Sequence, residues 1–301
     1  MKREKPERNL AQELVRVTEA AALAAGRFMG RADKHGSDKA AVEAMRLMLH
    51  TIEMDGVVVI GEGEKDEAPM LFNGERVGTG NDPKVDVAVD PIDGTRLLAL
   101  GRANALATVA VSDSGSMYDP GPFVYMNKIA VGPDAVKAID VEAPPAVNLQ
   151  KIAQAKGCDV DDLTVVILDR PRHEEMIAEV RDSGARIRLI TDGDVAGALM
   201  TSWPNSGIDV LMGIGGTPEG VLAACALKCM GGDIQGKLWP RNDMEIEDGK
   251  KSGYDFDKVL HIDDLVKGDN CFFAASGITD GELLHGVKYH GKGAQTHSLV
   301  M

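Results

Sequence analysis

The stretch "VDVAVDPIDGTRLLALG" (residues 85–101) runs from a strand pattern through a sharp turn into a predicted helix start. Its valines alternate with other residues, as in a β-strand. Asp90 and Asp93 then follow, with Gly94 and Thr95 directly behind them. One interpretation is an Asx-type turn that caps a helix. The other is a site where carboxylates bind a metal and helix-start N–H groups bind a phosphate.

The composition indicates a globular protein with an aliphatic core. The chain has 301 residues, 44% of them hydrophobic, 27% charged and only 4% aromatic, which suits one large or two ordinary domains. Its 33 basic and 47 acidic residues give a net charge of −14. Nucleic acids and anionic membranes bind basic surfaces, so both are excluded as expected partners. An anionic small molecule would need metal ions or local cations at its site.

The chain shows no targeting or membrane-spanning pattern. Its first ten residues are charged and lack the apolar segment of a signal peptide, and its apolar windows are strand-sized. We therefore expect a cytoplasmic protein. Four cysteines are present, and Cys225 and Cys229 lie one helical turn apart. They are expected to be small buried residues of a reduced protein, because no other close Cys or His pair completes a zinc site.

Periodicity predicts two helices followed by a sheet in the first part of the chain. The first helix spans 9–30 and the second begins near residue 37, with Ser37 or Asp38 as its N-cap. Strands of a single sheet are expected at 55–60, 84–90, 104–113 and 123–132. The Pro-rich segment "EAPPAVN" (142–148) is expected to separate a first half, 1–140, from a second, 141–301.

The second half alternates strands and helices. Three strand-helix units follow one another across residues 163–230, which is typical of a parallel or mixed α/β sheet. Strands are predicted again at 271–278 and 293–301, and the segment 245–257 is expected to be a solvated loop.

Acidic residues and glycines gather where the predicted strands end. The segments concerned are 61–64, 90–95, 169–172, 192–194 and 215–219. Ligands of α/β sheets collect at the carboxyl ends of strands. Mg²⁺ and Mn²⁺ prefer oxygen ligands, and two such ions can clamp a phosphate and a water together.

Each of these motifs also has a purely structural explanation. "GIGGTPEG" does not fit a dinucleotide loop, because Pro218 stands at the third glycine, but it suits a strand-to-helix turn. Asp38 is explained equally well as a helix cap, and Arg170 with Arg172 as a solvated face. His173 is expected to be a polar residue at a helix start. If the site were absent, each of these independent structural explanations would have to be true, and all of them at the ends of predicted strands. The occurrence of all the motifs together at strand ends therefore favours a metal-phosphate site.

Five segments together resemble the lithium-sensitive, metal-dependent phosphatase superfamily, which includes inositol monophosphatases and fructose-1,6-bisphosphatases. Their details are similar to the bacterial class II (GlpX-type) fructose-1,6-bisphosphatase family over nearly the whole chain. The segments are "GEGEKDEAPML", "VDVAVDPIDGTRL", "VVILDRPRHEEMI", "TDGDVAGALM" and "MGIGGTPEGVLAA". The resemblance implies an α/β fold: an αβαβα layered sandwich of mixed sheets with helices between and outside them, forming one compact unit.

The resemblance also implies a set of site residues. Asp38 and Glu62 would hold one divalent ion, and Asp90, Asp93 and Glu219 a second, the ions being Mn²⁺ or Mg²⁺. Family members often carry Glu at the position of Asp93. Thr95 would orient or activate the attacking water, with Lys34 and Asp66 close to the reaction centre. Substrate contacts are implied for Asp93, Gly94, Thr95, Tyr125, Arg170, Pro171, Arg172, Asp192, Gly193, Asp194 and Gly216.

The implied activity is metal-dependent hydrolysis of the 1-phosphate of fructose 1,6-bisphosphate in gluconeogenesis. Sedoheptulose 1,7-bisphosphate, alone or in addition, is an alternative substrate. A phosphatase of inositol phosphates or nucleotide bisphosphates and a non-catalytic sugar-phosphate binder are further alternatives. A homodimer or homotetramer and lithium sensitivity are expected by the same resemblance. The family usually continues beyond "QTHSLVM", so a final strand is expected to be absent here.

Overall fold

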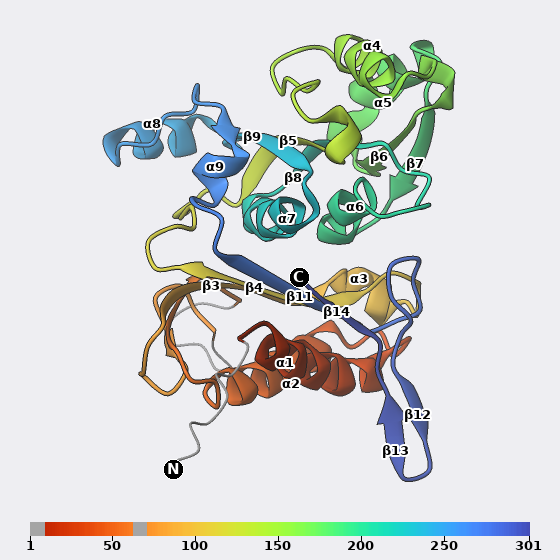
Figure 1. The fold of residues 1–301 in the computed structure, drawn as a ribbon. Helices are drawn as coiled ribbons and strands as arrows, with labels where there is room; N and C mark the ends of the chain where they lie inside the picture. The colour runs from red at the N-terminus through yellow and green to blue at the C-terminus, as the bar shows by residue number, and fades with distance from the viewer. Residues whose placement is uncertain (1–9, 63–70) are drawn as a thin grey trace, which may run out of the picture.

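The structure, a computed structural model, describes residues 10–62 and 71–301. Five layers stack in Figure 1: helices α4 and α5, a sheet, helices α6 and α7, a second sheet, and helices α1 and α2. Within the described part of the chain, each of the two large sheets has six strands. The predicted αβαβα sandwich of mixed sheets is confirmed. No helix in these residues is long and apolar enough to cross a membrane.

The first sheet combines the early strands of the chain with its last ones. Its order is β14-β11-β4-β3-β1-β2. The strands are β1 (Asp55–Ile60), β2 (Arg76–Val77), β3 (Lys84–Asp93), β4 (Leu106–Asp113), β11 (Cys271–Gly277) and β14 (Ser298–Val300). β1 and β3 are parallel, and the other pairs are antiparallel.

The second sheet begins with β5 and has the order β10-β9-β5-β8-β6-β7. Its strands are β5 (Tyr125–Val131), β6 (Thr164–Leu168), β7 (Arg186–Ile190), β8 (Val210–Gly216), β9 (Asp233–Leu238) and β10 (Leu260–His261). β6 runs parallel to β7 and β8, whereas β5 is antiparallel to β8 and β9. The prediction that β4 and β5 share a sheet is therefore wrong. Both strands are buried, and burial in a sequence does not tell which strand is the partner.

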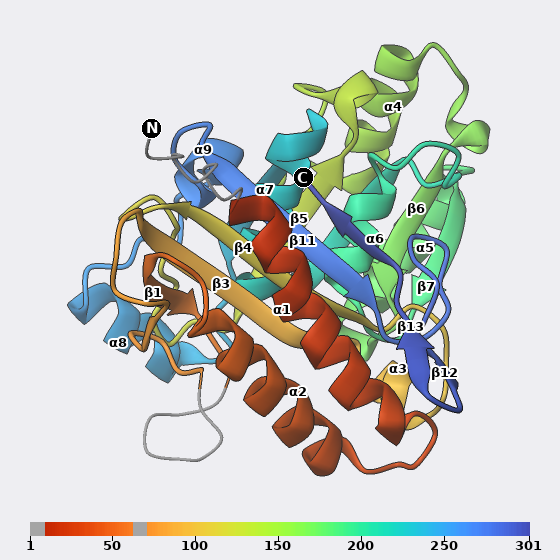
Figure 2. The same cartoon turned by 60° about the horizontal axis from the view of Figure 1, so that its bottom comes forward.

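The helices cover both sheets and separate them. Those outside are α1 (Leu10–Ala25) and α2 (Lys34–Leu49) on the first sheet, and α4 (Pro145–Lys156) and α5 (Glu174–Asp182) on the second (Figures 1 and 2). Between the sheets lie α6 (Asp194–Met200) and α7 (Thr217–Met230). Every residue of α7 from Gly220 to Leu227 is buried. A helix that is apolar all round is expected where sheets flank it on two sides.

Short elements complete the fold. They are α3 (Thr95–Ala99), α8 (Asp243–Lys251), α9 (Ile262–Leu265), the hairpin strands β12 (Lys288–His290) and β13 (Gly293–Gln295), and 3-10 turns at Gly26–Phe28, Pro133–Ala135, Val160–Asp162 and Pro171–His173. One of the helices corrects a sequence-based expectation. Helix α8 occupies the predicted solvated loop, and its N-cap Asn242 accepts the N–H of Glu245 at 3.0 Å. Helix α4 starts within the Pro-rich segment, because Pro145 suits the first helical turn.

The start of α2 also differs from the prediction. Its N-cap is Asp33, whose Oδ1 accepts the N–H of Gly36 at 2.8 Å. The helix therefore begins at Lys34, earlier than Ser37 or Asp38. Asp38 lies inside the helix and is not its cap, so its carboxylate is available for other contacts.

A β-bulge reshapes the end of β3. The strand pairs with β4 at Asp90 opposite Thr108 and again at Asp93 opposite Leu106, so one extra residue lies in β3. Pro91 falls inside this irregularity, where the ladder needs no N–H from it. The strand consequently continues to Asp93, where the sequence suggested that it ends at Asp90. The Oδ1 atom of Asp90 accepts the N–H of Ile92 at 3.0 Å.

Two loops from different sheets cap each other's helices. Asp93, at the end of β3, accepts the N–H of Ala196 in α6 through its Oδ2 atom at 3.0 Å. Asp192, after β7, accepts the N–H of Arg96 in α3 through its Oδ2 atom, also at 3.0 Å. The N-cap residue of each helix is a glycine with positive φ, 97° in α3 and 84° in α6. Glycine adopts this conformation without steric cost, which lets each loop turn toward the other.

The capping of α2 gives a first prediction. We expect Asp33→Ala to lower the free energy of unfolding by about 1 kcal/mol, the usual effect of losing an N-cap. Asp38→Ala should cost less, because burial raises the pKa of Asp38 and makes its charged form unfavourable in the fold. Urea titrations of both variants at pH 7 would measure the difference. A larger loss for Asp38→Ala than for Asp33→Ala would contradict this assignment of the cap.

Candidate active site

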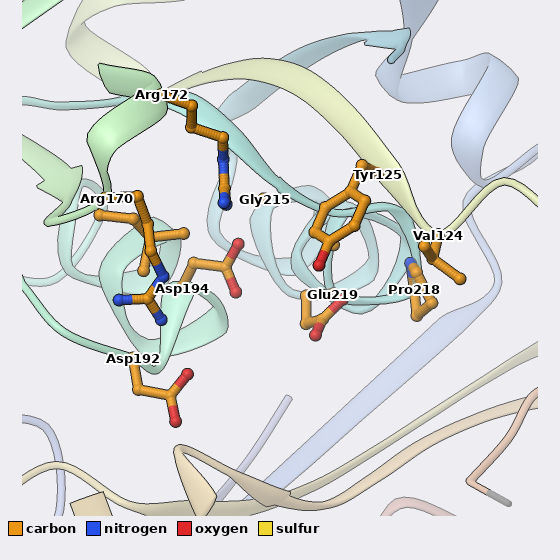
Figure 3. Close-up of a pocket in the computed structure, with 11 residues that line it drawn as sticks. Val124, Tyr125, Arg170, Arg172, Asp192, Asp194, Gly215, Pro218 and Glu219 are labelled. Carbon is orange, nitrogen blue, oxygen red and sulfur yellow. The ribbon is translucent and has the colours of Figure 1, made fainter. Parts of the chain in front are cut away.

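A pocket of about 360 Å³ opens between the carboxyl ends of the second sheet's strands and the first turn of α7 (Figure 3). Four separate segments of the chain contribute to it. Its lining consists of Val124, Tyr125, Leu168, Arg170, Arg172, Asp192, Asp194, Gly215, Gly216, Pro218 and Glu219. Seven of these were predicted site residues: Tyr125, Arg170, Arg172, Asp192, Asp194, Gly216 and Glu219. Pro171 and Gly193 are adjacent in sequence to lining residues but do not line the pocket themselves.

The arginines form one side of the pocket, opposite Tyr125 and Glu219 (Figure 3). Arg172 donates from Nε and Nη2 to the carbonyl of Ile214, at 3.2 and 2.7 Å, and lies 5.3 Å from the centroid of the Tyr125 ring. Arg170 donates from Nη1 to the carbonyl of Asp169 at 3.0 Å. Each guanidinium retains further N–H donors for an anion. Arg172 is exposed and Arg170 partly exposed, which agrees with a solvated face, and both also line the pocket.

His173 has a structural role in the wall of the pocket. Its side chain is 1% exposed. Its Nδ1 atom lies 2.7 Å from the carbonyl of Leu168, and its Nε2 atom accepts the N–H of Ile214 at 2.8 Å. The neutral Nδ1–H tautomer satisfies both contacts, and burial lowers the pKa of His173. The ring thus connects the end of β6 to β8 through hydrogen bonds. The sequence had suggested only a polar residue at a helix start.

Acidic side chains gather where the first sheet meets α7. Burial is the main cause that raises the pKa of Asp90 and Asp93 well above the usual range. Neighbouring carboxylates raise it further: Asp93, Glu219 and Glu62 act on Asp90. The pKa of Glu219 rises from its ordinary 4.5 to about 7, through burial first and Asp194 second. These groups repel one another and need positive charge nearby.

Two glycines of β8 make room for acidic side chains. An added Cβ atom at Gly215 would collide with the Oδ2 atom of Asp194 and would lie 2.9 Å from Cε of Lys128. An added Cβ atom at Gly216 would collide with the carboxylate of Glu219. Gly215 and Gly216 of "GIGG" are therefore needed to leave space for acidic side chains at the pocket. This requirement accounts for the two glycines, and no dinucleotide-binding role is needed to explain them.

Lys128, which the sequence did not suggest, supplies a buried positive charge to the site. It is 3% exposed and lies on β5. Its Nζ atom is 2.7 Å from Oδ2 of Asp194 and donates to the carbonyl of Gly216 at 2.9 Å. The Lys128 ammonium also lowers the pKa of Glu219, against the stronger effect of burial. Only the tertiary structure reveals it, because Lys128 belongs to none of the motifs, although it shares β5 with the predicted residue Tyr125.

Asp38 and Thr95 bring α2 to the start of α3. The Thr95 hydroxyl is 3.3 Å from Oδ1 of Asp38 and 3.3 Å from the carbonyl of Ile92. Lys34 lies one helical turn before Asp38 and lowers its pKa against the larger, opposite effect of burial. Asp38 in turn helps to raise the pKa of Glu62, after the main contribution of burial. Asp66 was also predicted here, but it lies outside the described residues.

The donor chemistry of these carboxylates fits a divalent cation. Asp38, Glu62, Asp90, Asp93 and Glu219 offer only oxygen atoms, and their raised pKa values show that charge compensation is incomplete. In residues 10–62 and 71–301, no three His, Cys, Asp or Glu side chains converge closely enough to form a finished metal site. The five predicted ligands are thus electrostatic neighbours, while their binding of metal remains a prediction.

The predicted residues fall into two adjoining groups. One contains Asp38, Glu62, Asp90, Asp93, Gly94 and Thr95, at the edge of the first sheet. The other contains the pocket residues on the second sheet. Glu219 belongs to both, because it lines the pocket and acts on the pKa of Asp90 and Asp93. The capping contacts of Asp93 and Asp192 hold the two groups together.

The chain is similar to known proteins over nearly its whole length. The family described as "Bacterial fructose-1,6-bisphosphatase, glpX-encoded" matches residues 8–301. Over 307 aligned residues the chain is 47% identical to fructose-1,6-bisphosphatase 1 class 2 of Escherichia coli strain K12 and to fructose-1,6-bisphosphatase class 2 of Shigella flexneri. Each alignment covers 98% of this chain and 91% of the relative.

The match extends over every segment that builds the two groups of site residues, from α2 to α7. It also includes β11 and β14, the strands that complete the first sheet. The protein is therefore a member of the glpX-encoded bacterial fructose-1,6-bisphosphatase family.

Proposed function

We propose that this protein hydrolyses the 1-phosphate of fructose 1,6-bisphosphate, giving fructose 6-phosphate and inorganic phosphate. The observation that carries the proposal is a pocket with two arginines facing a buried acidic cluster. A bisphosphate matches such a pocket, because the arginines suit one phosphate and metal-bearing carboxylates suit the other. The relatives' names, which specify fructose-1,6-bisphosphatase, support the choice of sugar.

One set of residues would bind the substrate. Arg170 and Arg172 would hold the 6-phosphate, and Asp192 and Asp194 would accept hydrogen bonds from sugar hydroxyls. Gly94 would present its N–H group to the 1-phosphate at the start of α3.

The water would be placed by Thr95. Its hydroxyl lies between Asp38 and the carbonyl of Ile92, so a proton donated to Asp38 leaves its lone pairs to accept from a water. A water held there can attack phosphorus in line with the departing sugar oxygen. Lys34, on the same helix as Asp38, adds positive charge at this end of the site.

We assign Asp38 and Glu62 to one divalent ion and Asp90, Asp93 and Glu219 to a second, with Mn²⁺ or Mg²⁺ as the metal. Bound at these positions, the ions would neutralise phosphate charge and acidify the attacking water. Asp93 uses Oδ2 to cap α6, which leaves Oδ1 as its free ligand atom. A cytoplasmic homodimer or homotetramer, and lithium sensitivity, are further parts of the proposal.

Sedoheptulose 1,7-bisphosphate is the alternative substrate, because both sugars carry two phosphates. A phosphate-release panel over fructose 1,6-bisphosphate, sedoheptulose 1,7-bisphosphate and inositol 1-phosphate, with Mn²⁺ or EDTA, tests the proposal. We expect the fructose substrate to have the highest kcat/KM, and EDTA or Asp90→Ala to abolish turnover while the protein stays folded. Arg170→Met should raise KM for bisphosphates without raising it for a monophosphate. Release from inositol 1-phosphate alone would contradict the proposal.

Metal binding also has a thermodynamic signature. The pKa of Glu219 is raised from 4.5 to about 7, so the folded, metal-free protein retains a proton that the unfolded chain has released. Its free energy of unfolding in EDTA should therefore fall as the pH rises from about 4.5 to 7, by on the order of 3 kcal/mol from this group. Mn²⁺ should restore stability at pH 7.5. Thermal denaturation across this pH range measures both effects.

Glu219→Gln provides the control for this experiment. The amide keeps the shape of the side chain and removes its charge, so the fall with rising pH should be smaller and the metal-free variant more stable at pH 7.5. An unchanged pH profile in the variant, or no stabilisation of the wild type by Mn²⁺, would contradict the assignment of Glu219 as a metal ligand.

The role of Gly216 can be tested by adding a single methyl group. Its backbone (φ −68°, ψ 139°) accepts alanine, but the new Cβ would displace the Glu219 carboxylate. We expect Gly216→Ala to lower kcat/KM roughly 100-fold, as a misplaced catalytic group does, with little change in Tm. Gly293→Ala, where no atom lies within 4 Å of the added Cβ, is the matched control. Equal activity in the two variants would refute the steric argument.

A further inference from the structure

Three of the four cysteines meet at the last turn of α7, where this helix packs against β11. The Sγ atoms of Cys229 and Cys271 are 3.9 Å apart, and the carbonyl of Cys225 lies 3.9 Å from Sγ of Cys271. Cys225 is buried, Cys229 is exposed and Cys271 is partly exposed. Glu219 lies ten residues before Cys229 on the same helix, about 15 Å along the axis at 1.5 Å per residue. This cluster is therefore separate from the active site.

The two accessible sulfurs are within reach of each other. A disulfide has an S–S distance of about 2.05 Å, so the sulfurs must approach by about 1.9 Å. Rotation of the two side chains about their Cα–Cβ bonds is the movement that would bring the sulfurs together. The cysteines are 42 residues apart in sequence, and only the packing of α7 on β11 brings them together. The sequence had predicted Cys229 to be buried, and its exposure corrects that expectation.

The surroundings make the two thiols chemically different. A hydrogen bond from Cys229 is the main cause that lowers the pKa of Cys271 to about 7, and the neighbouring Lys228 lowers it further. The same hydrogen bond raises the pKa of Cys229. Lys228 is held in place by an ion pair with Asp263 at 2.7 Å. The thiolate is the nucleophile of cysteine chemistry, so in the proposal that follows Cys271 attacks first and the exposed Cys229, whose sulfur is 3.9 Å away, resolves.

We propose that Cys229 and Cys271 form a reversible oxidation site that cross-links α7 to β11 when a hydroperoxide is present. With hydrogen peroxide, the Cys271 thiolate attacks one oxygen, the O–O bond breaks and hydroxide leaves. Cys271 becomes a sulfenic acid, and the hydroxide takes up the proton that the thiol had lost to give one water. Cys229 then attacks the sulfenic sulfur, forming the S–S bond and releasing a second water. The two thiols lose two electrons, which reduce the peroxide. A dithiol reverses the reaction by thiol–disulfide exchange.

The cross-link secures the helix that carries Glu219. It joins the last turn of α7, in the middle layer, to the first residue of β11, in the first sheet. Closing a loop of this length restricts the unfolded chain more than the folded one. The oxidised protein should therefore unfold at a higher temperature than the reduced one.

The test uses the full chain and its Cys229→Ser, Cys271→Ser and Cys158→Ser variants, treated with hydrogen peroxide at pH 7.5. In the wild type we expect the free thiols to fall from four to two, with return on addition of dithiothreitol. Peptide mapping should find Cys229 joined to Cys271, and the Tm should rise by several degrees. Cys158→Ser, which removes a thiol remote from the pair, should form the same bond and show the same rise.

Three results would overturn the proposal. One is that all four thiols persist after treatment, and another is that a different pair, or sulfinic acid on Cys271 alone, is the product. The third is a rise in Tm that Cys229→Ser and Cys271→Ser also show. Because no phosphatase assay enters the test, its failure would leave the proposed hydrolysis of a sugar bisphosphate unaffected.

Discussion

The site depends on one constraint: two acidic loops, one from each sheet, must meet between the layers. Asp93 and Asp192 satisfy it by each accepting an N–H group at the start of the other loop's helix. A free N–H group at a helix start requires a partner, and a carboxylate is favoured there by the helix dipole. The same two contacts therefore join the sheets and align the residues proposed to bind the 1-phosphate with those proposed to bind the sugar.

Several features of the molecule follow from crowding acids at this junction. The bulge in β3 turns Asp90 and Asp93 into the space below α7, and the side-chain-free positions 215 and 216 let Asp194 and Glu219 approach the backbone. The energetic cost appears as raised pKa values, which burial and mutual repulsion both produce. Lys128 offsets part of it through its ion pair with Asp194. The remaining unfavourable charge is what a divalent cation would neutralise.

Asp93 has two roles at this junction. One of its oxygens is committed to the N–H of Ala196, so this carboxylate both caps a helix and serves as a predicted ligand. The adjoining wall of the pocket is equally constrained, because His173 holds β6 against β8 with both ring nitrogens. The arginines extend from this fixed frame. Binding groups on rigid elements keep their positions better than groups on isolated loops.

The sequence alone determined the strand-helix units, the layered α/β class and the chemical identity of most site residues. These depend on local periodicity, on turn residues and on motifs a few positions long, which are visible without a partner. It also led to the family, because five separate motifs occurred together in one order.

The tertiary structure decided what depends on contacts between distant segments. It showed that β5 leaves the first sheet while β11 and β14 return to it, that Asp33 and not Asp38 caps α2, and that Lys128 lies within the site. It also placed Cys271 beside Cys229. Each of these facts depends on packing between distant segments or on which of several residues caps a helix. The local sequence pattern is the same for every possible strand partner and helix cap, so it cannot distinguish between them.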